Sequence, residues 1–181
     1  KHIKIAAGLA HVSYARIADR VLEAIDGGVD YIHSDAADMY DLKNMQLMGG
    51  PQIISGLREV TDKHIECHIY TIECDRLFVE KLAKAGCTML IVPAEHFIGA
   101  PLAYLINYCR EFGMKIGLTV GCYTPLCFVD ESINDIDRLQ IVTHGVDDTD
   151  GQDNWGWRKS AVDLVQRARK LIDEKNPRCE L

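Results

Sequence analysis

The sequence predicts an α/β fold built on a parallel β-sheet, and two observations carry this prediction. Short apolar runs rich in β-branched residues alternate with longer stretches whose apolar residues recur at helical spacing. Each strand with its following helix takes about 30 residues, the length of a parallel crossover unit. No linker, low-complexity tract or charge block interrupts the alternation, so we expect a single domain over residues 1–181.

The expected strands are short β-branched runs bounded by glycine or polar residues. Six of them are predicted, at Ile3–Leu9, Asp30–Asp35, Ile65–Tyr70, Met89–Val92, Lys115–Val120 and Arg138–Thr143. A seventh strand is expected to start at Cys179–Leu181.

A helix is expected after each of the six strands, at Tyr14–Ile25, Gln52–Thr61, Asp75–Ala85, Pro101–Phe112, Pro125–Ile133 and Arg158–Glu174. The first helix should bury one apolar stripe, formed by Ile17, Val21, Leu22 and Ile25. Gly27 and Gly28 then end it. The last helix should bury Val162, Val165, Ala168, Leu171 and Ile172.

Six complete units leave two architectures open. One is an open sheet of six parallel strands, and the other is a (β/α)₈ barrel, which needs eight units and typically about 250 residues. A parallel edge strand of three residues is an unusual natural end. We therefore expect further residues to follow Leu181 in the natural protein.

Composition narrows the functional classes. The net charge is −7 and no basic stripe accompanies the Lys and Arg residues, so we expect no nucleic-acid partner. No apolar run approaches the roughly 18 residues of a membrane span, so we expect no membrane partner. The seven cysteines form no CxxC pair, which favours reduced thiols acting as small buried hydrophobes in the cytoplasm.

Candidate metal ligands lie near the carboxyl ends of two predicted strands. His33 and Asp35 are two residues apart on the second strand, so their side chains project from the same face. His68 occupies a similar height on the third strand. Two imidazoles and a carboxylate suit an open divalent metal site. The alternatives are a packing role for each histidine and a capping role for Asp35.

The order of several motifs resembles one known family. Residues 28–38 resemble the second-strand signature of the ribulose-phosphate 3-epimerase family: Gly, then Asp, an aromatic residue, Ile-His, an Asp, and another Asp three residues on. Residues 66–69 resemble its third-strand segment, in which an acidic residue precedes the metal-binding His by two. Further matches follow in order at Lys84–Gly86, Pro93–Glu95, Gly113–Gly117 and Tyr123–Pro125. This resemblance implies a (β/α)₈ TIM barrel, with about six βα units and the start of a seventh strand present.

The resemblance also implies a site and a reaction. His33, Asp35 and His68 would supply three of four ligands to one divalent metal ion (Zn, Fe, Mn or Co), the fourth being an Asp beyond Leu181. The implied reaction is 3-epimerisation of a ketose phosphate, such as ribulose 5-phosphate or a related pentulose or hexulose phosphate. Two carboxylates, one of them the catalytic Asp35, would exchange protons through a metal-stabilised enediolate. The expected partners are the sugar phosphate and a second copy of the chain in a homo-oligomer.

The substrate-binding positions depart from the family pattern. Gly8 and Tyr70 are expected in the substrate site, where the family has a Ser and a Met. Gly151 and Gln152 match a family phosphate-binding loop, but four aspartates surround them, and we interpret residues 144–153 as a solvated acidic loop. An EF-hand calcium pattern is not met there. We therefore expect a divergent member.

Two other functions stay open at this point. One is a decarboxylase or aldolase on the same barrel. Those relatives carry a Lys between two aspartates at the second strand, where this chain has Ala36 and Ala37. The other is a non-catalytic barrel that binds a sugar phosphate or serves as a scaffold.

Overall fold

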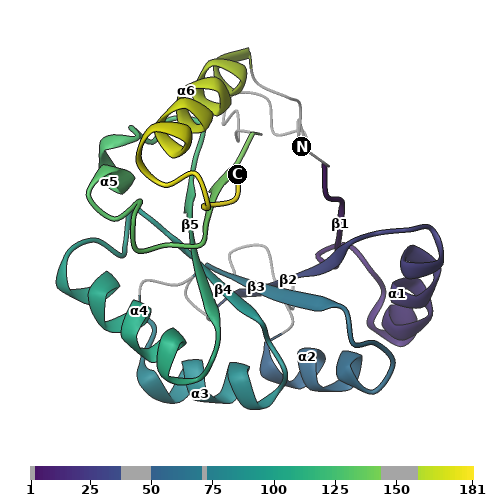
Figure 1. Ribbon diagram of the computed structural model, residues 1–181. Helices are drawn as coiled ribbons and strands as arrows, with labels where there is room; N and C mark the ends of the chain where they lie inside the picture. The colour runs from purple at the N-terminus through teal and green to yellow at the C-terminus, as the bar shows by residue number, and fades with distance from the viewer. Residues whose placement is uncertain (1–2, 38–49, 71–72, 144–158) are drawn as a thin grey trace, which may run out of the picture. The chain divides into compact units, whose positions relative to one another are not determined.

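The computed structural model describes residues 3–37, 50–70, 73–143 and 159–181 of the chain. In this part, β-strands and α-helices alternate from one end to the other (Figure 1). The strands are β1 Ala6–Gly8, β2 Tyr31–Ala37, β3 His64–Tyr70, β4 Met89–Pro93, β5 Lys115–Val120 and β6 Arg138–Ile141. The helices are α1 Ile17–Asp26, α2 Pro51–Arg58, α3 Arg76–Lys84, α4 Ala100–Glu111, α5 Cys127–Asp130 and α6 Lys159–Lys175.

The strand order decides between the two architectures that the sequence left open. The six strands follow one another through the sheet in chain order, and the pairings of β1–β2, β2–β3, β3–β4 and β5–β6 are parallel. Right-handed crossovers between sequential parallel strands place every helix on the same face of the sheet. A doubly wound open sheet instead reverses its strand order at a switch point. The sheet is therefore singly wound, as in the TIM-barrel class, and that prediction is confirmed.

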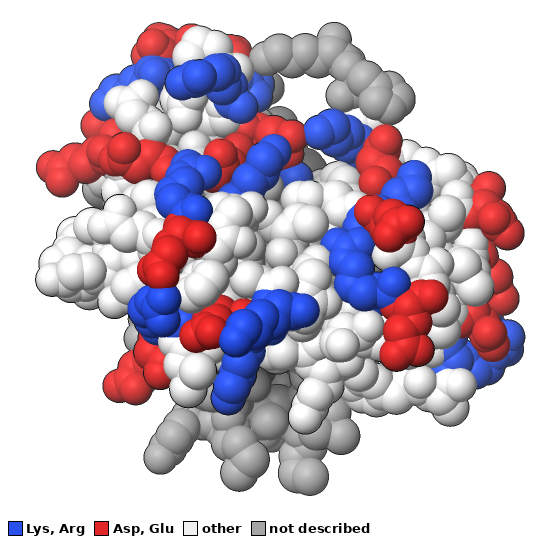
Figure 2. Space-filling view, turned by 60° about the horizontal axis from the view of Figure 1, so that its bottom comes forward, with Lys and Arg blue, Asp and Glu red and all other residues white. Residues whose placement is uncertain are grey.

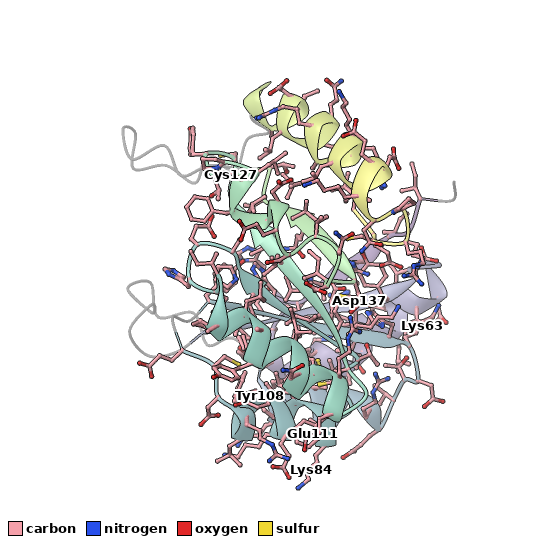
Figure 3. The ribbon with its side chains drawn as sticks, turned by 60° about the vertical axis from the view of Figure 1, so that its left-hand side comes forward. Lys63, Lys84, Tyr108, Glu111, Cys127 and Asp137 are labelled. Carbon is pink, nitrogen blue, oxygen red and sulfur yellow. The ribbon has the colours of Figure 1, made fainter. Side chains whose placement is uncertain are left out.

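The chain forms two compact units, and the first comprises residues 1–91 and 104–115. Its centre is the ladder between β2 and β3, which pairs seven residues on each strand. Figure 1 shows α1, α2 and α3 on one side of these strands. Arg76 of α3 forms an ion pair with Glu111, which Figure 3 labels at the end of α4. The Arg76 guanidinium lies 4.9 Å from the ring centroid of Phe112.

The second unit comprises residues 92–103 and 116–181. Here β5 and β6 pair in parallel from Gly117 and Arg138 onward. The predicted seventh strand appears only as an isolated parallel bridge between Arg138 and Glu180. Their side chains also form an ion pair of 2.6 Å, in which the guanidinium is nearly buried. The single domain over residues 1–181 stays a prediction.

Several element boundaries differ from the predictions. β1 covers three residues instead of seven, because only Ala6–Gly8 find ladder partners on β2, and Ile3 is 83% exposed. The first predicted helix starts with a separate 3₁₀ turn at Tyr14–Arg16. The helix predicted at 125–133 shrinks to the single turn of α5.

Two predicted helix faces were partly wrong. In α1, Val21 is buried as expected, but Leu22 is 43% exposed. In α6, Ala168 and Ile172 are buried as expected, but Val162 is 41% exposed, and Ala161 and Leu164 complete the buried face. Both stripes of α6 have helical spacing, so the choice between them depends on which face packs against the rest of the unit.

The surface charge and the burial of the cysteines agree in part with what the composition predicts. On the face that Figure 2 shows, positive and negative side chains are interspersed. No described helix is long and apolar enough to span a membrane. All seven cysteines are free, and the thiols of Cys67, Cys87, Cys109 and Cys179 are buried. Cys127 is exposed, so the prediction of buried thiols holds for only part of the set.

A clamp between Arg58 and Gly86 holds the loop before β3 against the loop before β4. The Arg58 guanidinium donates to the carbonyl oxygens of Gly86 at 2.7 and 2.9 Å, of Lys63 at 2.6 Å and of Thr61 at 3.1 Å. Gly86 has φ +93°, and a Cβ atom there would lie 2.6 Å from Cγ of Arg58. Both the backbone conformation and the close approach therefore require glycine.

We expect Gly86→Ala to lower the free energy of unfolding more than the matched change Gly28→Ala. Gly28 has nearly the same φ, +92°, but nothing lies within 4 Å of its added Cβ. Gly28→Ala should cost about 1–2 kcal/mol from backbone strain alone. Gly86→Ala should cost at least about 1 kcal/mol more, because it also displaces Arg58. Urea unfolding of both variants measures the difference, and equal losses would contradict the clamp.

Candidate metal centre

The register of β2 and β3 gathers polar side chains on one face of the first unit. Asp35 is the Cα partner of His68, and His33 is the partner of Glu66. Because strand side chains alternate, these four side chains share one face, while Ile32 and its alternating neighbours face the other way. The face of a buried parallel strand is usually apolar, so this row of acids and imidazoles calls for a chemical explanation.

Three of these side chains converge closely enough to hold one cation. One ligand atom each of His33, Asp35 and His68 lies within 4.8 Å of the others. Oδ1 of Asp35 is 3.3 Å from Nε2 of His33 and 3.6 Å from Nδ1 of His68. Metal–ligand bonds of about 2.0–2.2 Å in a tetrahedral shell place neighbouring ligand atoms about 3.3–3.6 Å apart. The donor set and the two distances to Asp35 fit a divalent transition metal.

Glu66 orients the first of the imidazoles. Its side chain is 2% exposed, and Oε1 lies 2.6 Å from Nδ1 of His33. A carboxylate at that distance accepts a hydrogen bond from Nδ1–H. When the ring is neutral, Nε2 therefore carries the lone pair and faces Asp35. Metal-ligating histidines commonly have such a carboxylate partner.

The electrostatics of the metal-free centre follow from this crowding of opposite charges. Burial lowers the pKa of His33, but the hydrogen bonds and charges of Asp35 and Glu66 outweigh it and raise that pKa to about 9. Burial likewise raises the pKa of Asp35, but His33 and His68 hold it well below its usual range. Asp35 is therefore ionised at neutral pH, which is the form that binds a cation or accepts a proton.

We expect the stability of the metal-free protein to fall with rising pH because of His33. Its folded-state pKa of about 9 exceeds the ordinary value of 6.5. Its contribution is therefore complete below pH 6.5 and is lost as the pH rises through 9. Urea unfolding in EDTA should show a loss of up to about 3 kcal/mol between pH 6.5 and 9.5 that His33→Asn lacks. Parallel pH profiles for the two proteins would contradict this assignment.

The expected substrate-site residues divide into two groups. Gly8 ends β1 as the Cα partner of His33, and a Cβ added there would meet nothing within 4 Å. Tyr70 lies beside the metal cluster, with its ring centroid 4.3 Å from that of His68. Burial, the charge of Asp35 and a hydrogen bond to Asp35 raise the pKa of Tyr70. Gly151 and Gln152, with the whole acidic loop, lie outside the described residues.

Two residues of the polar face had no assigned role in the sequence. Glu66 belongs to a segment that resembles a family motif, and nothing in the sequence predicts a role for His64. Nε2 of His64 lies 3.7 Å from Oε2 of Glu66. The available signal was the two-residue alternation of β3, which places positions 64, 66, 68 and 70 on one face.

Fold and cluster together define the class: a TIM-barrel protein with a candidate divalent-metal centre on its second and third strands. Sequence comparison then identifies the family. The chain belongs to the ribulose-phosphate 3-epimerase family, whose model matches residues 4–181.

Individual relatives agree with this membership. The chain is 28% identical over 177 residues to ribulose-phosphate 3-epimerase of Bacillus subtilis, covering 96% of this chain and 76% of the relative. It is 28% identical over 143 residues to the Synechocystis enzyme of the same name, covering 79% of this chain and 61% of that enzyme. Among solved structures, 3-keto-L-gulonate-6-phosphate decarboxylase from Vibrio cholerae matches with a TM-score of 0.69 at 17% identity. The match covers 94% of this chain and 75% of the decarboxylase chain. That last likeness supports the fold alone.

Proposed function

We propose that this protein is a metal-dependent 3-epimerase of a ketose phosphate, in which His33, Asp35 and His68 hold the metal. The observation that carries the proposal is the convergence of these three side chains in a member of the ribulose-phosphate 3-epimerase family. The family relatives are named for epimerisation of ribulose phosphate. Ribulose 5-phosphate or a related pentulose or hexulose phosphate is the proposed substrate class.

The chain's own residues divide the work as follows. Asp35, ionised and 8% exposed, is the proposed carboxylate that takes the proton from carbon 3 or returns it. Glu66 keeps Nε2 of His33 available as a ligand atom. Gly8 and Tyr70 are proposed to contact the sugar beside this centre, and Gly151 and Gln152 to contact its phosphate. The bound cation would stabilise the negative charge that develops on the substrate when the proton leaves.

The other two functions have less support. A decarboxylase or aldolase relative would need a Lys near Asp35, and this stretch of β2 carries Ala36 and Ala37 instead. The similarity to the decarboxylase structure is at 17% identity and extends to the fold only. A non-catalytic scaffold has no need of a buried carboxylate between two imidazoles, whose desolvation is expensive without a cation.

The test is proton exchange with solvent at carbon 3. The metal-loaded protein is incubated with ribulose 5-phosphate in D₂O, and loss of the C3 proton signal is followed by NMR. We expect deuterium uptake that EDTA stops and that added divalent metal restores. Xylulose 5-phosphate and hexulose phosphates define the preferred sugar. A metal-saturated protein that exchanges no proton of any of these ketose phosphates would overturn the proposal.

Three finer points belong to the same proposal. The set of two imidazoles and a carboxylate suits Zn, Fe, Mn or Co, and metal analysis of the purified protein identifies which ion it holds. A homo-oligomer is proposed, to be measured by light scattering after size exclusion. A cytoplasmic location is proposed, and seven free cysteines support a reducing compartment.

A further inference from the structure

His64 lies at the start of β3, one step further from the metal ligands than Glu66. Its ring packs edge-on against Tyr31, with centroids 5.6 Å apart at 84°. Nδ1 lies 2.6 Å from Oγ1 of Thr88. Nε2 lies 3.7 Å from Oε2 of Glu66, and within the described part of the chain it is a buried atom without a hydrogen-bond partner.

The hydrogen bonds around Thr88 leave two neutral tautomers of His64 to compare. Oγ1 of Thr88 accepts from the backbone N–H of Ile65 and lies within reach of two acceptors, Nδ1 of His64 at 2.6 Å and the carbonyl oxygen of Ile65 at 2.7 Å. That carbonyl already accepts the Thr88 backbone N–H at 2.8 Å. A carbonyl oxygen can accept two hydrogen bonds, so the hydroxyl hydrogen can be donated to this carbonyl or to Nδ1 of His64, and the contact with Thr88 fits both neutral tautomers of the ring.

The position of Glu66 decides between the two tautomers. If Nδ1 of a neutral His64 donated to Thr88, the bare lone pair of Nε2 would face a buried carboxylate, which is repulsive. With Nδ1 accepting, Nε2 carries the hydrogen and directs an N–H dipole toward Oε2 of Glu66. The separation of 3.7 Å is longer than a hydrogen bond but leaves both atoms facing each other in a buried site.

We propose that His64 is a positioning residue of the metal centre and acts through Glu66 on His33. The Glu66 carboxylate lies between two imidazoles. Its Oε1 accepts a hydrogen bond from Nδ1 of His33, 2.6 Å away, and its Oε2 faces Nε2 of His64. The N–H of His64 resists rotation of this carboxylate. It thereby keeps Nε2 of His33 directed at the cation. This inference rests on the proposed metal-binding function.

The reason for an effect at this distance is the burial of Glu66. A carboxylate that is 2% exposed has little water to replace a lost N–H donor. Without His64 it is expected to turn toward another donor, and the hydrogen bond to His33 is weakened. Loss of an outer partner of a metal ligand typically weakens metal binding 10- to 100-fold. His64 is one residue further out, so we expect the lower end, about tenfold.

Three substitutions of His64 separate its two nitrogens. His64→Gln keeps an amide donor near the position of Nε2, toward Glu66. His64→Asn keeps a polar atom near the position of Nδ1, toward Thr88, and leaves the Nε2 position empty. His64→Leu removes both. Glu66→Gln serves as the positive control, because it changes the carboxylate itself.

The measurement is Co²⁺ affinity of the full chain, from visible absorption titrations in competition with a chelator. We expect His64→Leu and His64→Asn to weaken Co²⁺ binding about tenfold, Glu66→Gln at least as much, and His64→Gln to stay close to wild type. The Co²⁺ absorption bands should shift in the two weakened His64 variants. Urea unfolding in EDTA checks that the variants fold. If His64→Leu does not fold, the comparison of His64→Gln with His64→Asn suffices.

The outcomes separate this inference from the function on which it rests. Equal Co²⁺ affinity in all three His64 variants would overturn it. It would also be overturned if His64→Asn bound Co²⁺ like the wild type while His64→Gln bound it as weakly as His64→Leu. The contact with Thr88 would then be the one that supports metal binding. A wild-type chain that binds no Co²⁺ would instead overturn the proposed metal function itself.

Discussion

Replacing Asp35 with Asn is expected to reduce deuterium exchange at carbon 3 of the ketose phosphate by at least about a hundredfold, even at saturating metal. Asn has nearly the same shape as Asp but cannot accept a proton from carbon. Asp35 is ionised in the structure because His33 and His68 hold its pKa low. The exchange rate is measured by NMR in D₂O over a range of metal concentrations.

A matched control separates this effect from the loss of one negative charge. Asp19 lies on the exposed face of α1, where its carboxylate is 3.6 Å from Nε of Arg16. Asp19→Asn should leave the exchange rate unchanged. If Asp35→Asn retained the wild-type rate at saturating metal, Asp35 would be a ligand only, and a different group would have to move the proton.

The second large effect is expected from His68→Ala, which should weaken binding of a divalent metal by more than about a hundredfold, beyond the range for outer-shell partners. The change removes one of three protein ligand atoms in the described centre. His68 is 2% exposed, so the substitution also leaves a cavity. His68→Asn fills more of that space and should weaken binding similarly. Chelator competition with Co²⁺ or Zn²⁺ measures both variants.

The control for this change is a histidine away from the cluster. His96 is exposed in the loop after β4, and His96→Ala should bind metal as the wild type does. Unfolding in EDTA shows how much of the His68→Ala effect comes from the fold. A His68→Ala protein that folds and keeps wild-type metal affinity would remove His68 from the site.

The three proposed ligands illustrate how much of a site a single sequence can predict. His33 and Asp35 were expected on one face because side chains alternate along any strand. His68 was expected beside them because carboxyl ends of parallel strands meet at one edge. The register bears out both expectations, with Asp35 directly opposite His68. The strand positions in β3, β4 and β5 were also predicted to within one residue.

Glu66 and the faces of the helices were harder to predict, for different reasons. An acidic residue two positions before a histidine is compatible with many roles, and only its approach to Nδ1 of His33 assigns one. In α6, a stripe containing Val162 and a stripe containing Ala161 have equally good helical spacing. The structure buries Ala161 and exposes Val162 because packing, not side-chain hydrophobicity alone, selects the face.

The order of residues along the chain was enough to predict the alternation of strands and helices, the residue types available for chemistry, and the face of each strand on which they lie. These properties depend on the covalent geometry of one short segment, so neighbouring residues suffice to predict them. The folded structure was needed to show that the strands follow one another in chain order and that His33 lies opposite Glu66. The pairing of His33 with Glu66 joins residues 33 positions apart, and such a register depends on how complete strands and helices pack together.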